Sequence, residues 1–306
     1  MARFAVGVDG GGSGTRVLIA DEHGSVIARA NAGPSALGLG VDRAWEEIGR
    51  ATRTALESVG VALDWSACAL CCGLSGVNNA TWRAAFERSI PAGASLLLVS
   101  DAYTTLWGAH GGQPGVIVAL GTGSIAAALV SVPNAAAGSE VGGDARLEER
   151  ISGGYGFPSG DEASGAWLGL RALVYLQQVM DGRRPADAFS DALREQLGVT
   201  TRDELVEWSC DANQTAYATL APTVIAFGGE SNPFAHGLLN QAGEEIARMI
   251  DALDPEGVMP VALCGGLAEP LAPFVPARFA PRLCAPMTDS AGGALALALR
   301  RIATGA

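Results

Sequence analysis

The amino-acid sequence predicts an α/β protein with two structurally related domains. A short apolar strand, a glycine-rich turn and a second strand follow one another twice, at Asp9 and at Gly121, and each copy opens one half of the chain. The chain has 306 residues, which is enough for two domains of ordinary size. Hydrophobic residues make up 49% and charged residues 17%, so the chain can bury a sizeable core.

The first half contains seven predicted elements, beginning with an antiparallel three-stranded meander. The first apolar run ends at Asp9 and a glycine cluster, and a turn that ends at Gly24 separates the next two runs. A segment with apolar residues at helical spacing ends at Gly60. The expected strands are 4–8, 16–20, 25–28, 67–74 and 95–99, and the expected helices are 43–60 and 80–89.

The second half repeats the opening pattern and then becomes mainly helical. Residues 125–132 follow the glycine turn and fit either a strand or a short helix, whereas 141–160 is rich in glycine and charge and is expected to be a loop over a site. The expected strands are 116–120 and 258–263, and the expected helices are 163–180, 241–252 and 289–302.

We place the domain boundary between residues 113 and 114. The N-terminal domain is then 1–113 and the C-terminal domain 114–288, and the helix within 289–306 is expected to pack back on the first domain. No proline- or serine-rich linker separates the halves. We therefore expect two closely coupled domains that hinge around a cleft.

Charge and composition exclude several classes of function. The formal net charge is −12, and an acidic surface repels nucleic-acid backbones and anionic lipids, so neither is expected as a partner. All 20 basic residues are arginine. A lysine-containing P-loop and Schiff-base chemistry on a lysine side chain are therefore impossible.

The six cysteines do not have the spacing of a zinc site. Cys68, Cys71 and Cys72 lie in an apolar run, and free buried thiols suit a reducing cytoplasm. The first strand reaches Asp9 after only a few apolar residues, and no apolar run approaches 18 residues. We therefore expect a cytoplasmic protein without a signal peptide or a membrane span.

The two glycine turns are typical of loops that bind phosphate. Glycine lets backbone N–H groups approach an anion closely, and Ser13 and Thr15 add hydroxyl donors to the first loop. Asp9 precedes that loop, where an acid makes sense if Mg²⁺ bridges it to the phosphate. The alternative is a glycine-rich hairpin without a ligand. The second loop formally matches a dinucleotide motif through Ala126, although the acid expected after a following strand is missing.

Acidic residues at the ends of predicted elements are further candidates for the site. Asp101 comes directly after the strand 95–99 and Ser100, where a carboxylate could serve as a general base; it could equally cap the following helix. Asp161 and Glu162 precede the helix 163–180 and also fit either ligand binding or capping. The sequence by itself leaves both choices open.

These motifs, taken together and in order, resemble those of N-acetylglucosamine kinases and bacterial glucosamine kinases. The matching segments are VDGGGSGT at 8–15, Asp101-Ala102, GTGS at 121–124, GGYG at 153–156 with SGDE at 159–162, and CGG at 264–266. The resemblance covers nearly the whole chain and places it in the superfamily of sugar kinases, actin and heat-shock ATPases. It implies two ribonuclease-H-like domains with an ATP cleft between them, and a homodimer is expected.

The resemblance also implies an ATP:hexosamine phosphotransferase that transfers the γ-phosphate to the 6-hydroxyl of N-acetylglucosamine or glucosamine. Asp101 would be the catalytic base and Asp9 the acid near Mg²⁺. The implied ATP-binding residues are Gly12, Ser13, Gly14, Thr15, Gly121, Thr122, Gly123, Ser124, Ala218, Gly265 and Gly266. The implied sugar-binding residues are Ser75, Gly76, Asp101, Gly154 and Asp161.

One departure from the family leaves the sugar undecided. The family carries a sugar-binding asparagine in the loop after the third strand, but here residues 33–40 read GPSALGLG, with Asn31 just before them. Three alternatives remain. These are an activator ATPase of 2-hydroxyacyl-CoA dehydratases, a non-catalytic sugar sensor and a nicotinamide enzyme.

Overall fold

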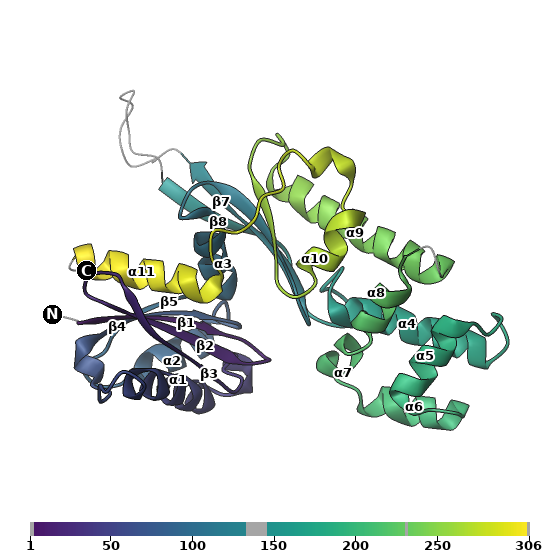
Figure 1. Cartoon of the computed structure of the whole chain (residues 1–306), viewed down its shortest axis with the longest axis horizontal. Coiled ribbons are helices and arrows are strands. Elements are labelled where there is room, and N and C mark those ends of the chain that lie inside the picture. The colour runs from purple at the N-terminus through teal and green to yellow at the C-terminus, as the bar shows by residue number, and fades with distance from the viewer. Residues whose placement is uncertain (1–2, 133–145, 230–231, 305–306) are drawn as a thin grey trace. The chain divides into compact units, whose positions relative to one another are not determined.

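The computed structural model describes residues 3–132, 146–229 and 232–304, and the chain divides into two compact units. Unit 1 comprises residues 1–115, 129–149 and 285–306, and unit 2 comprises residues 116–128 and 150–284. Each unit contains a β-sheet with helices packed against it (Figure 1). The predicted α/β class is confirmed.

The sheet of unit 1 has five strands in the order β3-β2-β1-β4-β5. The predicted meander is present, because β1 pairs antiparallel with β2, and β2 with β3. Strand β4 pairs parallel with both β1 and β5, so the carboxyl ends of β1, β4 and β5 lie at one edge. The strands are β1 (Phe4–Gly10), β2 (Thr15–Asp21), β3 (Val26–Ala32), β4 (Cys68–Leu74) and β5 (Ser95–Ser100).

Helices cover both faces of this sheet (Figure 1). On one face α1 (Val41–Glu57) and α2 (Ala80–Arg88) bury a core in which Trp45 stacks on Phe86 at 4.2 Å between ring centroids. On the other face lie α3 (Asp101–His110) and α11 (Ser290–Thr304). The packing of α11 is close, since a Cβ added at Gly7 of β1 would lie 2.3 Å from the backbone nitrogen of Leu295.

Helices α3 and α11 contact each other through glycine as well. A Cβ added at Gly293 would lie 1.9 Å from the Thr104 carbonyl oxygen, and one added at Gly108 would lie 2.3 Å from the Asp289 carbonyl oxygen. The hydroxyls of Thr104 and Ser290 share a hydrogen bond of 2.8 Å across the pair. At Gly108 and Gly293 the two helices therefore pack backbone against backbone and leave no room for a side chain.

Unit 2 holds most of the helices of the chain and the greater part of a second sheet, whose strands β7 and β8 also have residues in unit 1. The strand order of this sheet is β8-β7-β6-β9. The strands are β6 (Gly115–Leu120), β7 (Ser124–Val132), β8 (Arg146–Gly153) and β9 (Val261–Cys264). The helices of unit 2 are α4 (Gly165–Met180), α5 (Ala188–Leu197), α6 (Arg202–Asp211), α7 (Gln214–Ala218), α8 (Ala221–Phe227), α9 (Pro233–Leu253) and α10 (Ala268–Leu271).

The prediction of a loop over 141–160 is wrong for the strand β8. Residues 141–145 lie outside the described residues. Strand β8 carries Glu148, Glu149 and Arg150, and charge of this kind argued for a loop. An edge strand pairs on one side only, however, and tolerates charged residues on its open side. Within the described ranges no helix is both long and apolar enough to cross a lipid bilayer.

Candidate active site

The first glycine loop lies between β1 and β2 and leaves its backbone open. The Gly11 amide donates to the Gly14 carbonyl at 3.0 Å, which closes the turn. A Cβ added at Gly11 or Gly12 would meet nothing within 4 Å, so the protein itself does not cover the loop. The loop borders a hollow of about 480 Å³, lined by Asp9, Gly11, Ser13, Gly14, Thr15, Arg16, Asn31 and Ala32.

The Thr15 hydroxyl faces the interior instead of this hollow. Thr15 is only 1% exposed, and its Oγ1 lies 2.6 Å from the Gly33 carbonyl oxygen and 2.7 Å from Ser35 Oγ. The amides of Ser35 and Ala36 donate to the Gly11 carbonyl oxygen. These bonds tie the segment after β3 to the glycine loop and leave the exposed Ser13 hydroxyl as the one directed outward.

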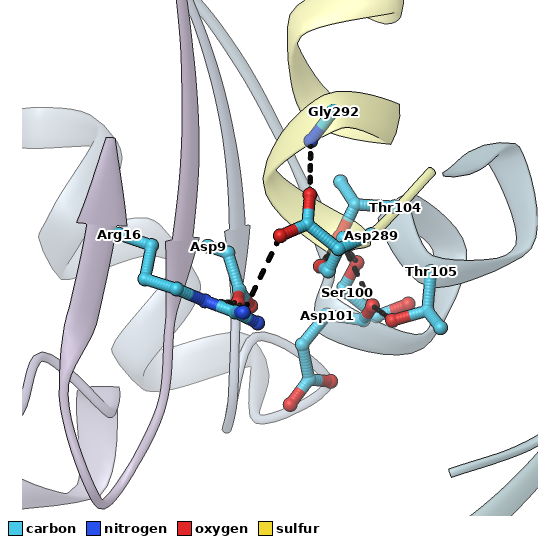
Figure 2. A network of polar contacts seen from close by, with 9 residues as sticks. Asp9, Arg16, Ser100, Asp101, Thr104, Thr105, Asp289 and Gly292 are labelled. Atoms are coloured by element: carbon cyan, nitrogen blue, oxygen red, sulfur yellow. Dashed lines mark hydrogen bonds and ion pairs between the residues drawn. The ribbon is translucent and has the colours of Figure 1, made fainter. Parts of the chain in front are cut away.

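An arginine that the sequence analysis did not single out lies beside the loop. Figure 2 shows Arg16 reaching toward Asp9 and Asp289. Its Nε and Nη2 donate to Asp9 Oδ2 at 3.0 and 2.5 Å, and its Nη1 lies 3.3 Å from Asp289 Oδ2. The Arg16 side chain is 53% exposed, so it can reach a ligand in the hollow. The absence of lysine, together with an arginine directly after the loop, was the signal that could have found it.

Asp9 could supply one carboxylate ligand to Mg²⁺, with the other ligands coming from water and phosphate. Mg²⁺ commonly takes one or two carboxylates and fills its other positions with water and phosphate oxygens. Both bonds from Arg16 fall on Asp9 Oδ2, which leaves Oδ1 outside the ion pair. Nowhere in the part of the chain that the structure covers do three or more His, Cys, Asp or Glu side chains gather as metal ligands. A phosphate-borne Mg²⁺ therefore fits Asp9, and a cage made only of protein does not.

Asp101 is the first residue of α3, but it does not cap the helix. The N-cap is Ser100, whose hydroxyl accepts a 2.9 Å bond from the Tyr103 amide and donates to Glu149 Oε1 at 2.8 Å. The capping alternative for Asp101 is therefore wrong. Burial, and then the charges of Asp9 and Glu149, raise the pKa of Asp101 to about 6, although the Ala102 amide bonds to Oδ1. In Figure 2 the Asp101 carboxyl group points away from Asp289.

The sequence after β4 meets the first loop at the same edge of the sheet. The Ser75 amide donates to the Gly10 carbonyl oxygen at 3.0 Å, and the Ser75 carbonyl accepts from the Leu37 amide at 3.0 Å. Gly76 has φ +91°, and a Cβ there would lie 3.2 Å from the Trp82 ring. Both predicted sugar residues therefore lie on a tight turn that is bonded to β1.

The second glycine loop, residues 121–124 in unit 2, is held by the start of α4. The amides of Gly165 and Ala166 donate to the carbonyl oxygens of Gly121 and Thr122, at 2.8 and 3.2 Å. The Ser124 hydroxyl is 6% exposed and donates to the Glu162 carbonyl at 2.6 Å. The Gly121 amide donates to the Gly123 carbonyl at 2.9 Å, so three loop carbonyls are already bonded, and the Ser124 amide bonds to Asp161. An anion would therefore meet the amides of Thr122 and Gly123 and the Thr122 side chain.

Asp161 is buried beside this loop, and it does not cap α4 either. The N-cap of α4 is Ser164, which rules out the capping interpretation of both Asp161 and Glu162. Asp161 is 6% exposed, and its Oδ2 accepts a 2.6 Å bond from Gln214 Nε2. Its Oδ1 accepts a 3.2 Å bond from the Gly156 amide. Burial raises the pKa of Asp161, and these bonds offset part of that shift. No sequence motif marked Gln214.

Three of the remaining predicted residues of unit 2 contact residues that adjoin the second glycine loop or hold it. Gly154 has φ +71°, and a Cβ there would lie 2.9 Å from Ile125. Gly265 has φ +89° and packs against Leu120, where a Cβ would lie 2.4 Å from the carbonyl oxygen. Ala218 ends α7, and its Cβ would lie 3.2 Å from one added at Gly165. Gly266 is open, with nothing within 4 Å of an added Cβ.

Comparison with known proteins places this arrangement among ATPases and sugar kinases. The sequence profile of the BadF/BadG/BcrA/BcrD ATPase family matches residues 6–273. The glucosamine kinase GspK of Vibrio cholerae is 29% identical over 297 residues, which cover 96% of this chain and 95% of that protein. The N-acetyl-D-glucosamine kinase of Dictyostelium discoideum is 24% identical, with 86% and 85% of the two chains covered.

A solved structure from Chromobacterium violaceum, provisionally named an N-acetylglucosamine kinase, is more similar still. It is 44% identical and superimposes with a TM-score of 0.88, covering 97% of this chain and 99% of that one. The likeness extends over both units, so the fold of the whole chain has a counterpart in a solved structure.

Proposed function

The chain belongs to the BadF/BadG/BcrA/BcrD ATPase family, and we propose that it is an ATP-dependent amino-sugar kinase acting on the 6-hydroxyl of glucosamine or N-acetylglucosamine. The observation that carries this proposal is the Asp101 carboxyl at the start of α3, with its pKa raised to about 6. A base of this strength is ionised at neutral pH and can accept a proton from an alcohol as it attacks. The kinases named above support the same reaction.

In the proposed reaction Asp101 accepts the proton of the sugar hydroxyl while its oxygen attacks the γ-phosphorus. The bond from that phosphorus to the bridging oxygen breaks, and ADP leaves with the electron pair. Phosphoryl transfer of this type depends on positioning and charge stabilisation more than on covalent catalysis. The protein must therefore hold the hydroxyl at Asp101 and neutralise the phosphates.

In this lysine-free chain the neutralising groups are backbone amides, Arg16 and Mg²⁺. We assign phosphate binding to the open backbone of residues 11–14 with Ser13, and to the amides of Thr122 and Gly123 with the Thr122 side chain. Mg²⁺ at Asp9 would balance phosphate charge when bound. We assign Gly265, Gly266 and Ala218 to the nucleoside, and Ser75, Gly76, Gly154 and Asp161 to the sugar.

The finer features of the proposal concern the sugar and the assembly. Residues 33–40 hold no asparagine, whereas Asn31 on β3 is exposed and lines the hollow beside Asp9. The proposal therefore includes both glucosamine, with its free amine, and N-acetylglucosamine. We also propose a homodimer in the cytoplasm, in keeping with six free cysteines.

The test of the proposed function is ADP release with Mg²⁺ and ATP across a panel of sugars. The panel contains glucosamine, N-acetylglucosamine, N-acetylmannosamine, glucose and no sugar. We expect turnover that depends on one amino sugar. Slow ATP hydrolysis that ignores every sugar would contradict the kinase and favour an activator ATPase, whereas sugar binding without turnover would favour a sensor.

Replacing Arg16 by glutamine is expected to raise the KM for ATP by roughly 10- to 100-fold. A hydrogen bond to a charged group contributes about 1.5–3 kcal/mol, and losing that free energy weakens binding roughly 10- to 100-fold. The sugar KM should change little, because Arg16 contacts the hollow beside the glycine loop. Initial-rate kinetics with each substrate varied in turn measure both values.

The matched control is Arg29→Gln, which removes the same charge from an exposed position on β3 of the same unit. Its kinetics should equal those of the wild type. Equal ATP KM values for the Arg16 and Arg29 variants would show that Arg16 does not contact phosphate.

A further inference from the structure

Three segments of unit 2 meet at the side chain of Asp161. Its Oδ1 accepts the bond from the Gly156 amide, and its Oδ2 accepts the bond from Gln214, the first residue of α7. A Cβ added at Gly123 would lie 2.6 Å from Asp161 Oδ2 and 3.1 Å from Gln214 Nε2. The Asp161–Gln214 pair thus packs against the backbone of the second glycine loop.

The backbone at this junction adopts conformations that side chains rarely permit. Asp161 has φ +56° and Ala163 has φ +65°, and no other non-glycine residue with positive φ is found in the described ranges. Such conformations persist only where the surroundings restrain them, and they cluster at functional sites. The bonds from Gln214 and Gly156 are restraints of this kind on Asp161.

Gln214 also begins the helix that leads to Ala218. The side chain of Asn213 caps α7 through the Ala216 amide at 3.0 Å, which fixes the direction in which Gln214 enters the helix. At the other end of α7, Ala218 packs against Gly165, whose amide holds the second glycine loop. One short helix therefore contacts the second glycine loop through its first residue, and through its last residue it contacts Gly165, whose amide holds that loop.

We propose that Gln214 is a positioning residue that sets Asp161, and through it the 153–156 turn, in the geometry that binds the sugar. The inference rests on the proposed function, since it assigns Asp161 and Gly154 to the sugar. Gln214 itself need not touch the substrate. It donates one hydrogen bond to a buried carboxylate and fills the space above Gly123.

The first test replaces Gln214 by methionine, which keeps the length of the side chain but cannot donate. We expect the sugar KM to rise about 10-fold, with the ATP KM changed less than 2-fold and the thermal midpoint close to that of the wild type. Gln177→Met, at an exposed position of α4 in the same unit, is the matched control and should be unaffected. Equal sugar KM values for the two variants would overturn the inference.

The second test uses Gln214→Glu, which places a carboxyl group beside Asp161. At pH 8 the two carboxylates, with Glu162 adding its charge to Asp161, should repel and weaken sugar binding about 30-fold. Near pH 5.5 the two carboxyl groups share a proton, which restores a hydrogen-bond donor between them. The ratio of variant to wild-type sugar Kd should therefore fall toward 1. A ratio that stays constant over this range would contradict a hydrogen-bonding role and leave only a role in packing.

The outcomes separate this inference from the proposed function. Sugar-dependent turnover by the wild type, with unchanged kinetics in both Gln214 variants, would reject the positioning role alone. No turnover by the wild type with any sugar of the panel would reject the kinase and the inference together.

Discussion

Asp101→Asn is expected to lower turnover about 1,000-fold while ATP binding survives. General-base catalysis contributes roughly 10²–10⁴-fold, and asparagine cannot accept the proton. The backbone should not change, because the asparagine oxygen can still accept the bond that the Ala102 amide gives to Oδ1. Turnover is measured as ADP release, and binding by titration with a non-hydrolysable ATP analogue. A variant that keeps a rate near that of the wild type would remove Asp101 from the role of base.

The pH dependence of the wild type should carry the same signature. The base must be ionised, so kcat/KM for the sugar should fall below about pH 6, where Asp101 becomes protonated. The residual activity of Asp101→Asn should lack this acidic limb. If the pH profile of Asp101→Asn kept its acidic limb at the same pH, the titration would belong to another group.

The same substitution should make the protein more stable at neutral pH. The pKa of Asp101 is raised in the folded state from an ordinary value of 3.8 to about 6, so the folded chain binds more protons than the unfolded chain between these values. Stability therefore falls as pH rises from about 4 to about 6, and this cost remains above that range. Asparagine carries no such cost, so thermal unfolding at pH 7.5 should show a higher midpoint for the inactive variant.

Gly293→Ala is expected to destabilise the protein by about 3 kcal/mol, near the upper end for overpacking. The added Cβ would lie 1.9 Å from the Thr104 carbonyl oxygen and 2.5 Å from the Gly108 nitrogen, both backbone atoms of α3. Neither can move aside unless the two helices separate, which would also disturb the Thr104–Ser290 hydrogen bond. Urea-induced unfolding measures the loss.

The control is the same substitution at Gly237 of α9, where an added Cβ meets nothing within 4 Å. Alanine there should stabilise the helix by up to about 1 kcal/mol, because it has a higher helix propensity than glycine. Opposite signs at the two positions would tie the effect at Gly293 to its contact with α3. A stabilising effect at both would show that α11 does not pack as described.

The sequence predicted those parts of the fold that have a strong local pattern. The meander and the position of Asp101 after a strand follow from apolar runs ended by acids and glycines. The capping question could not be decided, because Ser100 and Asp101 are both good N-caps and only the structure shows which oxygen meets the Tyr103 amide. Strand β8 was missed because its charged residues conceal the alternation of an edge strand.

The site residues outside glycine motifs were harder to predict. Gln214 lies 53 positions beyond Asp161, and a single glutamine carries no local pattern. The helices between residues 188 and 227 are short, so their periodicity is weak. Arg16 could have been predicted, since a lysine-free chain that binds phosphate needs arginine near its glycine loop.

The packing of α11 on β1 also has a consequence for the order in which the protein can fold on the ribosome. The strands of unit 1 emerge early, but one face of their sheet, which includes Ala5, Ala20 and Cys71, is covered by residues of α11. That helix is translated only after the whole of unit 2. During the synthesis of unit 2 a nascent chain therefore lacks the α11 cover on this part of the sheet, and unit 1 begins to form first but is completed last.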